Sequence, residues 1–135
     1  MKHSITLGVA CLGRTTFDVA AARGIWAETR KALGALENVT IVAPDDLVIE
    51  PDEARAAGDL FAKARVDGLV ILSGTFHLGH LALELAKALP TVPLMLWGLP
   101  ELPYDGGKIR LNSVCGVNLN ASNQYNTGNR NYYYT

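Results

Sequence analysis

The sequence predicts a three-layer α/β sandwich, in which helices cover both faces of a mainly parallel sheet of four to five strands. Short, nearly continuous apolar runs alternate along the chain with segments whose apolar residues recur at helical spacing. Such continuous runs are typical of strands that helices bury on both faces. The length of 135 residues suits one domain with a core of its own.

Four apolar runs predict the strands. The run closest to the centre of the sequence, Leu-Val-Ile-Leu, follows an Asp-Gly turn and is the clearest buried strand. Pro93 stands near the start of the last run, where a missing N–H is tolerated. Alternation with helices implies right-handed crossovers and the doubly wound, flavodoxin-like arrangement. The predicted strands span residues 5–12, 39–43, 69–72 and 92–97.

Three segments between these strands have helical spacing. Thr15 and Asp18 predict a capping box before the first helix, which continues to about Gly34. Pro51 suits the first position of the second helix, and Pro90 ends the third. Residues 113–124 favour a last helix by the spacing of their apolar residues, although their asparagines count against it.

The domain is expected to cover residues 1–128. Residues 129–135 then form a tail or the start of a further domain that is missing here. Three adjacent tyrosines, Tyr132, Tyr133 and Tyr134, have β-propensity and predict either an edge strand or the first strand of that further domain.

Charge and cysteine usage exclude several classes of protein. The net charge of −1 is scattered, so no basic block points to nucleic acid or to a membrane surface. No segment approaches the length of a membrane span, and Arg14 interrupts the first apolar run too early for a signal peptide. Cys11 and Cys115 lie among apolar neighbours, which predicts buried free thiols in a soluble, cytoplasmic protein.

In an open parallel sheet, ligands bind outside the carboxyl ends of the strands. Arg14 follows the first strand there, and its guanidinium can bind a carboxylate, a phosphate or sugar hydroxyls, or else pair with Asp18. Phe76 follows the third strand and can stack on a sugar ring or close the top of the core. Asp45 and Asp46 follow the second strand as a loop cap.

Other site types find little support. His77 and His80 can share a helix face, but a metal site needs a third ligand and none is nearby in sequence. Residues 12–16 lack the glycine pattern of a dinucleotide-binding turn or a P-loop. No nucleophile–base arrangement is evident, so no catalytic residue is predicted.

Four ordered stretches carry a family resemblance. Together they resemble the N-terminal domain of the L-fucose isomerase and L-arabinose isomerase superfamily, most closely its fucose-isomerase-like branch. The resemblance extends to about residue 128. The stretches are GVACLGRTTFD at residues 8–18, SGTFHLGH at 73–80, LMLWGLPE at 94–101 and RLNSVCGVNLNAS at 110–122.

The resemblance implies part of an aldose–ketose isomerase, which moves a proton through an enediol while a divalent metal, typically Mn²⁺, holds two sugar oxygens. Such enzymes are homo-oligomers in which the N-terminal domain of one subunit covers the active site of its neighbour. By position, Arg14 and Phe76 correspond to residues that contact the sugar, and His77 is a third candidate.

The family's metal ligands lie in later domains and have no counterparts here. We therefore expect no cofactor in this chain and no activity from it alone. Its expected partners are a sugar substrate and the remaining isomerase domains or neighbouring subunits. Two alternatives stay open, namely a stand-alone module that binds a sugar or sugar phosphate and a domain that serves assembly only.

Overall fold

A computed structural model of the chain describes residues 3–135, which form an α/β fold around one five-stranded sheet. All strand pairs are parallel, and the strand order is β2-β1-β3-β4-β5. This order is the one found in flavodoxin-like proteins. The strands are β1 (Ile5–Leu12), β2 (Val39–Val42), β3 (Gly68–Ser73), β4 (Leu94–Trp97) and β5 (Tyr132–Tyr134).

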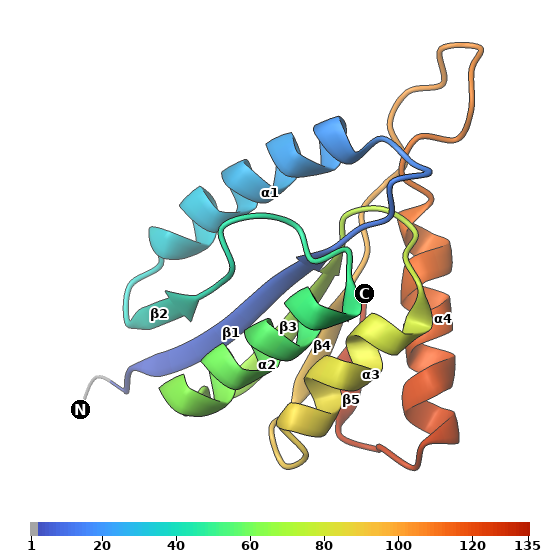
Figure 1. The fold of residues 1–135 in the computed structure, drawn as a ribbon. Helices are drawn as coiled ribbons and strands as arrows, with labels where there is room; N and C mark the ends of the chain where they lie inside the picture. The colour runs from blue at the N-terminus through green and yellow to red at the C-terminus, as the bar shows by residue number, and fades with distance from the viewer. Residues whose placement is uncertain (1–2) are drawn as a thin grey trace.

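Helices cover both faces of the sheet, which confirms the predicted three-layer, doubly wound sandwich (Figure 1). One face packs against α1, and two cores form as a result, one on each side of the sheet. The larger core lies between the sheet and the other helices. The helices are α1 (Val19–Gly34), α2 (Pro51–Ala64), α3 (Gly79–Ala88) and α4 (Ser113–Asn126).

Local sequence explains where two of these helices begin. Pro51 occupies the first turn of α2, and the side chains and amides of Glu50 and Glu53 form a reciprocal capping box. For α1 the predicted capping box from Thr15 is wrong. Residues 14–17 form a turn, closed by the Phe17 N–H to the Arg14 carbonyl at 3.0 Å, so Asp18 itself becomes the N-cap. Its carboxylate accepts the Ala21 N–H at 2.9 Å.

The end of the chain completes the sheet. Tyr132–Tyr134 pairs in parallel with β4, with Leu94 opposite Tyr132, so the edge-strand alternative is confirmed. The assignment of residues 129–135 to a tail or a further domain stays a prediction.

The cysteines are both free, and Cys11 is buried as predicted. Burial raises the pKa of the Cys11 thiol to about 12. The expectation of burial is wrong for Cys115, which is exposed on α4 because the sheet-facing side of this helix is formed by other residues, such as Val117. Within residues 3–135, no helix combines the length and the apolar character that crossing a membrane requires.

Phe61 of α2 packs at the centre of the larger core, and a Cβ on Gly8 of β1 would lie only 2.9 Å from its ring. We expect Phe61→Ala to lower the free energy of unfolding by about 3–5 kcal/mol, because it leaves a cavity in the core. The neighbouring Leu60 is 42% exposed, so Leu60→Ala should cost less than about 1 kcal/mol. Urea unfolding followed by circular dichroism measures both, and similar losses would contradict this description of the core.

Candidate functional site

The strand order creates a switch point between β1 and β3. From β1 the chain passes to β2 on one side, whereas β3 lies on the other side and leads on to β4. The β1–α1 loop (residues 13–18) and the β3–α3 loop (residues 74–78) therefore diverge at this point, where doubly wound folds bind their ligands. Arg14 and Phe76 come from these two loops, so the fold brings these sequence-predicted site residues to the same edge of the sheet.

Direct contacts join the two loops. The Arg14 N–H donates to the Thr75 hydroxyl at 2.9 Å. The rings of Phe17 and Phe76 lie 5.9 Å apart between centroids and are tilted by 59°. Phe76 is half-buried, so its ring contacts Phe17 at the surface and leaves part of its area open. The loops thus form one continuous surface with arginine and aromatic side chains.

A third segment crosses the switch point and closes it. The β4–α4 loop (residues 98–112), orange in Figure 1, extends past the sheet and returns toward α4. The Arg110 carbonyl accepts the Asp18 N–H at 2.9 Å, and the Leu111 carbonyl accepts the Phe76 N–H at 2.7 Å. The Leu111 side chain is fully buried in the core on the α1 side. We call residues 110–112 the closing segment, because its carbonyls bond to both loops.

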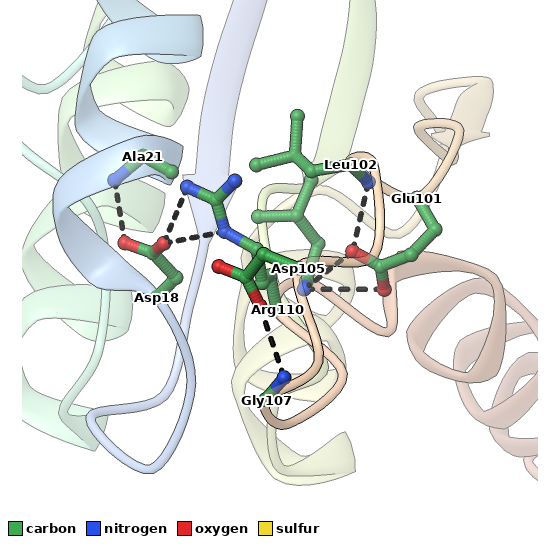
Figure 2. A network of polar contacts seen from close by, with 8 residues as sticks. Asp18, Ala21, Glu101, Leu102, Asp105, Gly107 and Arg110 are labelled. Atoms are coloured by element: carbon green, nitrogen blue, oxygen red, sulfur yellow. Dashed lines mark hydrogen bonds and ion pairs between the residues drawn. The ribbon is translucent and has the colours of Figure 1, made fainter.

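An ion pair fixes the closing segment to the start of α1 (Figure 2). The Asp18 carboxylate accepts Arg110 Nη2 at 2.8 Å and Nε at 2.9 Å, as well as the Ala21 N–H. The Ala21 N–H and then the Arg110 side chain hold the pKa of Asp18 below its ordinary value. Asp18 therefore pairs with Arg110 and not with Arg14. The Arg14 guanidinium has no ion pair or hydrogen bond within residues 3–135.

Glu101 closes the base of the β4–α4 loop (Figure 2). Its carboxylate accepts the N–H groups of Leu102 at 2.8 Å, Leu111 at 3.0 Å and Asn112 at 2.8 Å. Desolvation acts to raise the pKa of the exposed Glu101, but the N–H groups of Asn112, Leu111, Leu102 and Arg110 outweigh it and leave the pKa below its ordinary value. Sequence reasoning missed the roles of Glu101 and Arg110, because each depends on the path of a long loop.

His77 is buried rather than placed on the open surface. Its Nε2 lies 3.0 Å from the Ser73 hydroxyl and 3.2 Å from Asn120 Nδ2, and its Nδ1 lies 3.3 Å from the Leu78 carbonyl. Burial lowers the pKa of His77 to about 4, so the ring is neutral at pH 7. In this arrangement His77 ties the β3–α3 loop to α4, and a role in contacting a sugar stays a prediction.

Asp45, Asp46 and His80 were also singled out in the sequence. The two aspartates bind neighbouring groups, and His80 lacks, within residues 3–135, the further ligands that a metal site needs. Asp46 accepts the Leu47 N–H at 2.7 Å and pairs with Arg23, as a loop cap does, while Asp45 pairs with Arg30. His80 is exposed on α3. In the described part of the chain, no group of three or more His, Cys, Asp or Glu side chains could hold a metal ion.

The low pKa of Glu101 gives a pH-dependent prediction. Its carboxylate holds the closing segment at pH 7, and this contribution is lost as the pH falls through a midpoint below the ordinary value of 4.5. In an NMR titration, the amide signals of Leu111 and Asn112 should shift with that midpoint, and Glu101→Gln should abolish the transition. Asp105→Asn is the control, because Asp105 accepts the Gly107 N–H at the tip of the loop and has no hydrogen bond to the closing segment within residues 3–135. A midpoint at or above 4.5 would argue against the account.

The family model described as fucose/sulfoquinovose isomerase, N-terminal domain, matches residues 8–135. Among curated protein sequences, none matches the chain.

Three solved structures are loosely similar. A Mycobacterium smegmatis protein in complex with β-D-fucofuranose has a TM-score of 0.49 at 12% identity, over 98% of this chain and 54% of that one. A solute-binding protein of an ABC transporter from Bacillus halodurans C-125, with bound myo-inositol, has a TM-score of 0.47 at 9% identity, over 100% of this chain and 56% of that one. Type B ribose 5-phosphate isomerase from Leishmania infantum has a TM-score of 0.35 at 14% identity, over 87% of this chain and 82% of that one. The chain spans about half the length of the first two proteins.

Proposed function

Because this chain belongs to the fucose/sulfoquinovose isomerase N-terminal domain family, we propose that it is the substrate-covering and assembly domain of an aldose–ketose isomerase of carbohydrate metabolism. One observation carries the proposal. Arg14 and Phe76, which are distant in sequence, lie on two loops that are hydrogen-bonded to each other at the switch point. These are the residues that the family resemblance assigns to sugar contact.

The chemistry of this surface suits one end of a sugar. The Arg14 guanidinium, which has no partner within residues 3–135, can donate to neighbouring hydroxyls or to an anionic substituent. The half-buried ring of Phe76 offers an apolar face to the C–H groups of a sugar ring, and Phe17 supports it from the side. These groups bind and orient a substrate, and they supply no proton transfer.

The metal that family membership implies does not fit this chain. Manganese needs several oxygen or nitrogen ligands together, and no such group of three or more side chains lies within residues 3–135. No step of the isomerisation is therefore derived from these residues. In the proposal the metal ligands come from other domains, and the isolated chain does not convert sugars.

The shape of the surface supports a need for partners. Leu111 fills the crevice that would otherwise enclose a ligand, so a sugar at Arg14 and Phe76 would be covered on one side only. We propose that the remaining isomerase domains, or a neighbouring subunit of a homo-oligomer, supply the second wall. We place the assembly in the cytoplasm, where the thiols of Cys11 and Cys115 would stay reduced.

The unpaired Arg14 also favours a second candidate function, a stand-alone module that binds a sugar or sugar phosphate. Titration calorimetry of the 135-residue chain against pentoses, deoxyhexoses and their phosphates separates the two functions. Binding of one ligand by the isolated chain would support the module, whereas no heat across the panel would favour the covering domain.

Substitutions at Arg14 and Phe76 test the covering role in the assembled enzyme. Arg14→Ala and Phe76→Ala should each raise KM about tenfold and change kcat little, because contacts at the end of the sugar bind ground state and transition state alike. Arg130→Ala is the matched control, since its guanidinium stacks 4.2 Å above Tyr125 on another part of the domain and should leave both constants unchanged. Unchanged KM in both surface variants would leave only an assembly role.

Sugar conversion by the isolated chain would refute its proposed inactivity.

A further inference from the structure

We propose that Thr75 is the positioning residue of this surface, and that its hydroxyl sets the placement of Arg14 relative to Phe76. The inference rests on the proposed function, because it concerns how the two proposed sugar contacts are held. Thr75 does not itself face a sugar, since its side chain is fully buried.

The hydroxyl oxygen of Thr75 connects the backbones of Arg14 and Phe76. The Thr75 hydroxyl accepts the Arg14 N–H at 2.9 Å and donates its own proton to the Phe76 carbonyl at 2.7 Å. The hydroxyl therefore uses its donor proton within the β3–α3 loop and one of its acceptor lone pairs on the β1–α1 loop. The Thr75 N–H in turn donates to the Leu12 carbonyl at 3.3 Å, which ties this residue to the end of β1.

The other contacts at the switch point do not replace this link. The carbonyls of Arg110 and Leu111 hold the amides of Asp18 and Phe76, but neither of them reaches Arg14. Within residues 3–135, the only partner of the Arg14 N–H is the Thr75 hydroxyl. The Arg14 carbonyl accepts the Phe17 N–H at 3.0 Å within its own loop. The closing segment therefore keeps the loops in place, while the Thr75 hydroxyl joins the backbone of Arg14 to the β3–α3 loop.

The residue type fits this role. A β-branched side chain is stiff about χ1, so the direction of the Thr75 hydroxyl is fixed. Gly13 lies beside the hydroxyl, and a Cβ on it would meet the hydroxyl at an ordinary contact distance of 3.6 Å and Leu47 Cδ1 at a tighter 3.2 Å. Serine retains the hydroxyl without the methyl group, and valine retains the shape without the hydroxyl. These two substitutions therefore separate hydrogen bonding from packing.

Amide hydrogen exchange of the 135-residue chain tests the link directly. In Thr75→Val the Arg14 amide should exchange about tenfold faster or more, because its partner is gone. In Thr75→Ser the exchange should stay close to that of the wild type. The amide of Ile71 in β3 reports whether the core is intact and should be unchanged in both variants. An Arg14 amide that is equally protected in Thr75→Val and in the wild type would overturn the proposal.

Kinetics of the assembled enzyme test the consequence. Thr75→Val should raise KM about fivefold with kcat nearly unchanged, and Thr75→Ser should restore the wild-type KM. A Thr75→Val KM that stays at the wild-type value while Arg14→Ala raises it would refute positioning by Thr75. If neither Arg14→Ala nor Phe76→Ala alters KM, the proposed function fails instead, and the exchange experiment still tests the link.

Should Thr75→Val not fold, the wild type and Thr75→Ser decide the question. Slow exchange of the Arg14 amide in both proteins supports the link through the hydroxyl. Exchange in the wild type as fast as that of the exposed Lys108 amide would overturn it.

Discussion

Two hydrogen bonds from the closing segment determine the arrangement at the carboxyl edge of the sheet. The Arg110 carbonyl holds the amide of Asp18, and the Leu111 carbonyl holds the amide of Phe76. The first bond places the residue at which α1 begins, and the second places the aromatic ring of the β3–α3 loop. The Asp18–Arg110 ion pair and the N–H groups collected by Glu101 keep the segment in position. Loops from three strands thus behave as one body.

The same bonds bring Leu111 to the switch point, between the loops that follow β1 and β3. Doubly wound folds commonly bind ligands in the crevice at the switch point, and here Leu111 occupies that crevice as part of the core. Arg14 and Phe76 lie on the two loops at this edge, and both are half-buried. Such an arrangement suits a domain that covers a ligand held elsewhere.

The sequence predicted four of the strands, three of the helices and the edge of the sheet where the candidate residues lie, whereas it left the fifth strand and the last helix less certain. Apolar runs and helical spacing are local signals, and the carboxyl ends of parallel strands must share an edge, so Arg14 and Phe76 could be found as neighbours in advance. Asp18 and Arg110 are 92 residues apart, and Glu101 reaches Leu111 across a loop without regular structure. No periodicity encodes such contacts. The burial of His77 also depends on α4, the helix whose asparagines made it hardest to predict.

Hydrogen exchange at the amides of Asp18 and Phe76 in the native 135-residue chain examines this constraint most directly. The described geometry requires both amides to be well protected, and to lose protection together when the closing segment opens. Both amides should then exchange far more slowly than that of Lys108 at the exposed tip of the same loop. If either one exchanged as quickly as Lys108, the loops would not be joined through the closing segment, and the description of a single rigid surface would be wrong.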